Sequence, residues 1–81
     1  MNTSENLGRI RWKCRRGMLE LDLMLLKFFN EKFVSLSAEE KQQFEALLEQ
    51  PDPVLQEYLY GLAIPEDPAL QKIIAKIRGL G

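Results

Sequence analysis

Apolar residues recur every three or four positions along most of this chain, which is the spacing of one face of an α-helix. Apart from short alternating runs, such as residues 9–15 and 19–23, no segment has the pattern of a half-buried β-strand. Glycine and proline divide the pattern into five stretches. We therefore predict an all-α protein, a compact five-helix bundle forming a single domain over residues 1–81, with helices near 5–14, 17–33, 38–49, 53–60 and 68–78.

Three helix starts are indicated by residue type. Ser37 and Glu40 have the spacing of a capping box, in which each side chain bonds the backbone N–H of the other residue. The Asp-Pro pairs at 52–53 and 67–68 each place an N-cap residue before a proline suited to the first helical position. We expect helices to begin at all three places.

The second helix is expected to begin with Gly17 as its N-cap. Glu20 would then be the third helical residue, where its carboxylate can accept the cap N–H and lie at the positive end of the helix dipole. Arg16 precedes Glu20 by four residues, which is an ion-pair spacing if both are helical. This interpretation gives the three residues a purely structural role.

The same helix carries a broad apolar arc, which predicts that it is central and buried. The arc consists of Met18, Leu19, Leu21, Leu25, Leu26, Phe28, Phe29 and Phe33. Asp22 falls inside this arc, where a charge needs a partner. We expect that partner to be Arg15 or Arg11 of the preceding helix.

In the first helix, the apolar stripe and the tryptophan fall on different sides. Leu7, Ile10 and Cys14 share one stripe, whereas Trp12 falls opposite, on the side of Arg9. Cys14 is expected to pack as a small apolar residue. For Trp12 two interpretations are open: it stacks with arginines on an exposed surface, or it packs against a neighbouring helix from its own side.

Charge is distributed unevenly, although the net charge is only −1. Residues 33–70 hold eight acids and one cation, whereas residues 1–16 hold one acid and five cations. Those cations are Arg9, Arg11, Lys13, Arg15 and Arg16. A basic leading segment of this kind suits an acidic partner surface or a phosphate group.

Composition excludes several kinds of chemistry. With no histidine and one cysteine, the chain has no zinc-type ligand set, no histidine-assisted nucleophile and no internal disulfide. Its densest apolar run, residues 19–29, contains three charged residues and is shorter than the ~20 residues of a membrane span. The amino terminus lacks the pattern of a secretion signal. We expect a monomeric cytoplasmic protein that is not an enzyme, has no catalytic or metal-binding residues and does not insert into membranes.

One extended motif resembles a known family. Residues 12–22 read W-K-C-R-R-G-M-L-E-L-D and contain R-G-x-x-E at 16–20. With S-L-S-A-E-E-K at 35–41 and the Asp-Pro start at 52–53, the chain is similar to the succinate dehydrogenase assembly factors over nearly its whole length. Those proteins promote covalent attachment of FAD to the flavoprotein subunit.

The resemblance implies a partner-binding site. It would consist of Arg16, Gly17 and Glu20 at the contact, bordered by Arg9, Trp12, Arg15 and Asp22. The implied partner is the flavoprotein subunit of succinate dehydrogenase or of the related fumarate reductase. FAD belongs to that partner and is joined to one of its histidines, so no cofactor is expected on this chain. The implied mechanism is that of a chaperone, which holds histidine and flavin in a productive geometry.

Two other functions stay open on the residues alone. The basic and aromatic segment 9–16 could contact RNA or DNA, as in a small antitoxin-like protein. The acidic remainder of the chain argues against nucleic acid, because it would repel phosphate. The other possibility is a helical interaction module for a different acidic partner.

Overall fold

Five α-helices and one short 3-10 helix make up the computed structural model, which describes residues 3–79 and the side chains of residues 7–79. They are α1 (Thr3–Lys13), α2 (Leu19–Lys32), η1 (Phe33–Ser35), α3 (Ala38–Leu48), α4 (Asp52–Leu59) and α5 (Pro68–Ile77). No strand is formed in this range. The predicted all-α bundle of five helices is confirmed.

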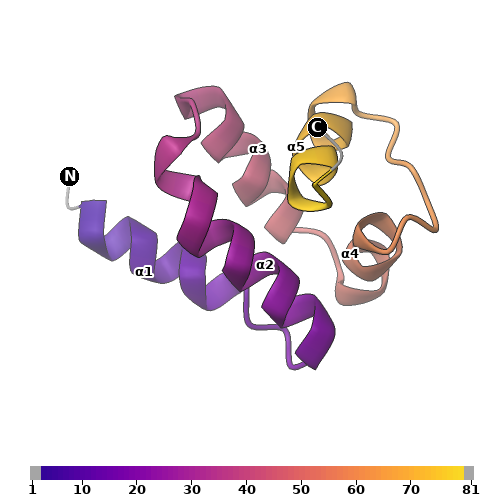
Figure 1. Cartoon of the computed structure of the whole chain (residues 1–81), viewed down its shortest axis with the longest axis horizontal. Coiled ribbons are helices and arrows are strands. Elements are labelled where there is room, and N and C mark those ends of the chain that lie inside the picture. Colours follow the sequence, from indigo (N-terminus) through magenta and orange to yellow (C-terminus); the bar gives the residue numbers. More distant parts are fainter. Residues whose placement is uncertain (1–2, 80–81) are drawn as a thin grey trace.

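Helix α1 passes behind α2 in the view of Figure 1, and the two are joined by a tight connection at residues 14–18. Helix α5 packs against α2, α3 and α4. In Figure 1, α1 and α5 lie on opposite sides of α2. The connection between α1 and α2 is therefore at the edge of the bundle, away from α5.

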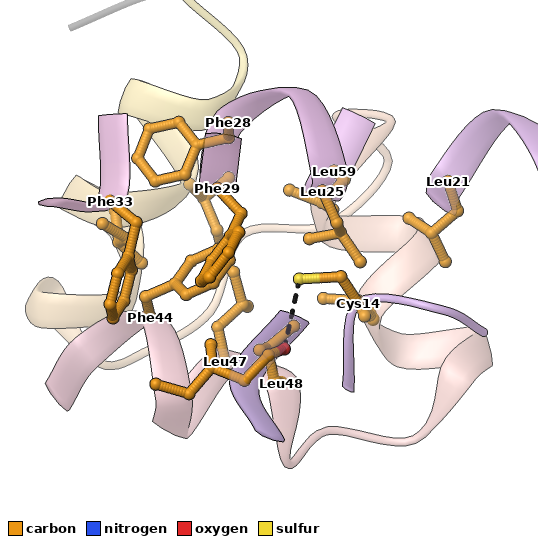
Figure 2. Packing of buried hydrophobic residues seen from close by; sticks show 14 residues of the cluster. Cys14, Leu21, Leu25, Phe28, Phe29, Phe33, Phe44, Leu47, Leu48 and Leu59 are labelled. Atoms are coloured by element: carbon orange, nitrogen blue, oxygen red, sulfur yellow. Dashed lines mark hydrogen bonds between the residues drawn. The ribbon is translucent and has the colours of Figure 1, made fainter. Parts of the chain in front are cut away.

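Helices α2 and α3 supply half of the fourteen buried core residues, including three of the four phenylalanines. Phe44 of α3 lies between two phenylalanines, with ring centroids 5.5 Å from Phe28 and 5.6 Å from Phe33. Phe29 stacks on Phe33 at 5.0 Å. Figure 2 shows these rings at one end of the core, and Leu21 and Leu25 of α2 with Cys14 toward the other. Burial of this apolar face fixes the orientation of α2, and with it the position of its first turn.

Cys14 extends this core to the end of α1. Its side chain is fully buried, and its Sγ donates a hydrogen bond to the Ile10 carbonyl at 3.5 Å (Figure 2). Burial raises the pKa of the Cys14 thiol to about 12, so the group stays protonated at neutral pH. The prediction that Cys14 packs as a small apolar residue is confirmed.

Helices begin at all three predicted places, to within one residue, and two of the predicted caps are confirmed. The Glu40 N–H donates to Ser37 Oγ at 3.1 Å and the Ser37 N–H donates to Glu40 Oε1 at 3.0 Å, which completes the capping box of α3. Asp67 caps α5, since its carboxylate accepts the Ala69 N–H at 2.9 Å. Both caps depend on residues within one helical turn.

The start of α4 differs from the prediction. Pro51 is the N-cap and Asp52 is the first helical residue, followed by Pro53. The Asp52 carboxylate is bound by Arg16, 3.1 Å away, instead of by the first N–H groups of its own helix. A contact between residues distant in the sequence has replaced the local cap.

Candidate functional site: the corner between α1 and α2

Gly17 sets the shape of the α1–α2 corner, by which we mean the last turns of α1, the connection 14–18 and the first turn of α2. Its φ is +81°, a backbone conformation that costs a residue with a side chain about 1–2 kcal/mol. A Cβ added there would meet nothing within 4 Å. Glycine is thus required by the backbone, and it leaves the turn open to solvent.

The expectation that Gly17 is the N-cap of α2 is wrong. Met18 holds that position with extended backbone geometry, which is usual for an N-cap, whereas Gly17 is left-handed. Glu20 is therefore the second helical residue, and within the described chain its carboxylate bonds neither Gly17 nor Met18. Its side chain is exposed, beside the positive end of the α2 dipole.

Asp22 holds the connection in place. Its two carboxylate oxygens accept the backbone N–H groups of Arg16, at 2.8 Å, and of Gly17, at 3.1 Å. The expected ion pair with Arg15 or Arg11 is not formed in the described part of the chain. The backbone donors satisfy the half-buried charge instead, because Asp22 lies one turn into α2 and faces the connection.

Arg16 points inward, toward the junction of α3 and α4. Its guanidinium pairs with Asp52 at 3.1 Å and donates to the carbonyls of Gln50, at 3.4 Å, and Leu48. The side chain is only 16% exposed. The alternative in which Arg16 pairs with Glu20 required both residues to be helical; Arg16 is not, and in the described residues the pair is not formed. The last carbonyls of α3 have no helical donors and carry partial negative charge, so they attract the cation.

Trp12 lies on the outer side of α1. It is 70% exposed, and the Arg15 guanidinium carbon lies 5.5 Å from its ring centroid, within range of a cation–π contact. This confirms the interpretation that places Trp12 with arginines on an exposed surface, and it excludes packing of the tryptophan into a neighbouring helix. Trp12, Arg11, Arg15, Gly8 and Leu26 of α2 line a shallow groove.

The five cations of the leading segment are used in different ways. Lys13 pairs with Glu49, the C-cap residue of α3, at 2.9 Å, and Arg16 is bound as described above. Arg9, Arg11 and Arg15 are exposed and pair with no acidic side chain among residues 7–79. The corner therefore presents positive charge to solvent on the side of Trp12.

Two leucines near the start of α2 are exposed, which the sequence pattern did not predict. Leu19 was expected in the buried arc, but it is 78% exposed, and Leu23 is 59% exposed. The core takes up only the side of α2 that carries Leu21, Leu25 and Phe28. The signal was present in the sequence, because α2 has more apolar residues than one buried face can hold.

Residues 3–79 contain neither a metal-ligand cluster nor a membrane-spanning helix. Among residues 3–79, no three His, Cys, Asp or Glu side chains gather where they could hold a metal ion. In the same range, no helix has both the length and the apolar character needed to cross a membrane.

The fold and the corner define a class of protein: a small helical bundle with a fixed, exposed turn next to a basic, tryptophan-bearing surface. The family model described as flavinator of succinate dehydrogenase matches residues 8–80. The FAD assembly factor SdhE of Coxiella burnetii is 56% identical over 80 residues, which cover 99% of this chain and 98% of that protein. The SdhE of Vibrio cholerae is 46% identical over 77 residues, covering 95% and 90%. The SdhE of Methylococcus capsulatus is 47% identical over 73 residues, covering 90% and 88%. This chain belongs to the family of flavinators of succinate dehydrogenase.

Proposed function

We propose that this protein is an assembly factor that binds the flavoprotein subunit of succinate dehydrogenase or fumarate reductase and promotes covalent attachment of FAD to it. The family to which it belongs supports the reaction. One structural observation supports the contact: Gly17, with its open turn, lies between the exposed pair Trp12–Arg15 and the exposed Glu20. A partner can approach this backbone without meeting a side chain.

On this proposal the chain supplies neither the flavin nor the residue that accepts it. It has no histidine, and its one thiol is buried and protonated. FAD and the acceptor histidine then both belong to the partner, and this protein acts as a non-catalytic chaperone, working as a monomer in the cytoplasm. Correct positioning of two reacting groups can by itself lower a barrier by several kcal/mol.

On this proposal, different residues of the corner hold the turn in place and contact the partner. Arg16 and Asp22 hold the turn by bonds within the chain, so the surface is rigid before the partner arrives. Trp12 and Arg15 are of the residue types most enriched at binding hot spots. Arg9 and Arg11 add positive charge, which favours an acidic surface on the partner and speeds encounter.

The test is reconstitution from purified parts. Apo-flavoprotein of either enzyme is incubated with FAD, with and without this protein, and covalent flavin is measured as fluorescence of the flavoprotein band after denaturing electrophoresis. The protein should raise the rate of covalent FAD attachment. Trp12→Ala should lower this stimulation at least about tenfold, because it removes a hot-spot side chain. Leu62→Ala, which also truncates an exposed apolar side chain, is the matched control. No stimulation by the wild-type protein with either flavoprotein would refute the proposal.

Binding of nucleic acid through residues 9–16 is less favoured by the structure. Two of the five cations, Lys13 and Arg16, are already paired with Glu49 and Asp52. We expect no binding when the protein is titrated against single-stranded RNA at physiological salt. Tight binding that weakens steeply with added salt would instead support this alternative.

A further inference from the structure

An apolar stripe on α2 continues the surface of the α1–α2 corner. Leu19, Leu23 and Leu26 are spaced i, i+4 and i+7, so they lie on one face of the helix. Leu19 and Leu23 are mostly exposed, and Leu26 lines the groove with Trp12. The stripe thus runs from the first turn of α2, next to Glu20, into the groove beside Trp12.

The fold gives no reason for these exposed leucines. The buried face of α2 is already formed by Leu21, Leu25 and Phe28, on the opposite side. If polar residues replaced Leu19 and Leu23, α2 would stay helical and the core would lose no packing. Exposed apolar residues that are contiguous and bordered by polar groups mark interaction surfaces.

We propose that Leu19, Leu23 and Leu26 form the apolar part of the docking surface for the same flavoprotein, an inference that rests on the proposed function. The stripe would be covered by an apolar patch of the partner with acidic groups at its border. Those acids would meet Arg11 and Arg15, which stand beside the groove and pair with no acidic side chain in residues 7–79. Such an arrangement has the apolar centre and charged rim of a specific interface.

A second copy of this chain agrees less well with this surface as the occupant. A twofold interface places the same patch of both copies face to face. Because the stripe adjoins the corner, such an interface would cover Gly17 and Trp12 in both copies and exclude the contact on which the proposed function rests. The flavoprotein is therefore the occupant that agrees with the proposed function.

The experiment compares a double variant with a matched control. Leu19→Gln/Leu23→Gln replaces exposed leucines by a good helix former of similar size, so the fold is expected to be unchanged. Val34→Gln makes the same kind of change on η1, at the far end of α2, where the side chain is 74% exposed. Kd for the purified flavoprotein is measured by isothermal titration calorimetry, and the oligomeric state by sedimentation.

The double variant should raise Kd at least tenfold, equivalent to about 1.4 kcal/mol, while Val34→Gln leaves Kd unchanged. If the double variant binds as the wild type does, whereas Gly17→Arg does not bind, this inference is overturned and the proposed function stands. If the wild type forms a dimer that the double variant loses, with Kd for the flavoprotein unaltered, the occupant is a second copy and the inference is overturned. If the wild type binds no flavoprotein, the proposed function itself fails.

Discussion

At the scale of single residues, the corner shows why the chemistry of a side chain does not by itself give its role. Arg16 has the residue type and position expected of a partner contact, yet it is bound to Asp52, 36 positions along the chain. No periodicity connects those two residues, so the contact could not be predicted from spacing. For Trp12, the α1 wheel placed the side chain away from the stripe of Leu7 and Ile10 but left open whether it stacks with arginines or packs against another helix. The structure shows that it is exposed.

Removal of the Arg16 guanidinium should destabilise the fold. Arg16→Met leaves the Leu48 and Gln50 carbonyls and the Asp52 carboxylate without their donor, and should lower the free energy of unfolding by about 2–3 kcal/mol. Arg15→Met, at an exposed position one residue earlier, should change it by less than about 0.5 kcal/mol. Urea denaturation of both variants measures the difference. Equal midpoints would show that the inward contacts of Arg16 do not stabilise the protein.

The Cys14 thiol should be unreactive in the folded protein. It is buried and its pKa is raised to about 12, so little thiolate exists at pH 8 and reagents cannot reach it. A disulfide reagent such as DTNB should modify Cys14 slowly in buffer and rapidly in denaturing urea. Fast modification under native conditions would contradict the packing of Cys14 against Ile10.

At the scale of elements, the helices predicted best are those with local signals. The capping box at Ser37 and the cap at Asp67 depend on residues two or three positions away, and both were predictable. The start of α2 was not, since the left-handed conformation of Gly17 follows from how the connection is held by Asp22. Leu19 was misplaced because a broad apolar arc does not indicate which part of it the core will cover.

Two of the three ion pairs among the described residues, Lys13–Glu49 and Lys76–Glu40, should make stability depend on pH. Hydrogen bonding by Lys76 lowers the pKa of Glu40, and hydrogen bonding by Lys13 lowers that of Glu49, both from an ordinary value of 4.5. A carboxyl group whose pKa is lower in the folded state stabilises the fold above its unfolded pKa. That contribution is lost as the pH falls below about 4.5 and through the lower folded value.

Glu40→Gln removes the ion pair between Glu40 and Lys76. At pH 7 the variant should have a lower Tm than the wild type. The difference in Tm should become smaller as the pH is lowered from 5 toward 3, because the wild-type carboxylate becomes protonated. Glu31→Gln is the control, since Glu31 forms no ion pair among the described side chains. A gap for Glu40→Gln that stays constant over this range would show that the Glu40–Lys76 pair is not the source of acid sensitivity.

At the scale of the whole molecule, charge and shape act together. The acidic residues lie mainly in residues 33–70, while three of the four exposed arginines among residues 7–79, Arg9, Arg11 and Arg15, lie in α1 or directly after it. The chain is thus polarised, with a basic surface around an open turn and the bundle behind it holding that turn in place. The chain belongs to the flavinators of succinate dehydrogenase, and the proposed function places the partner contact on this basic side of the molecule.

Two glycines of this chain allow the docking of that corner to be tested directly. Gly17 and Gly79 have nearly the same backbone conformation, with φ of +81° and +76°, and a Cβ would meet nothing within 4 Å at either position. Gly17→Arg and Gly79→Arg should therefore cost the fold a similar 1–2 kcal/mol, roughly, while only the first places a long side chain on the corner. The decisive measurement is the rate of covalent FAD attachment to purified apo-flavoprotein, at a temperature where thermal melts show both variants to be folded. Our account predicts that Gly79→Arg supports attachment as the wild type does and that Gly17→Arg does not; equal support by both variants would contradict it.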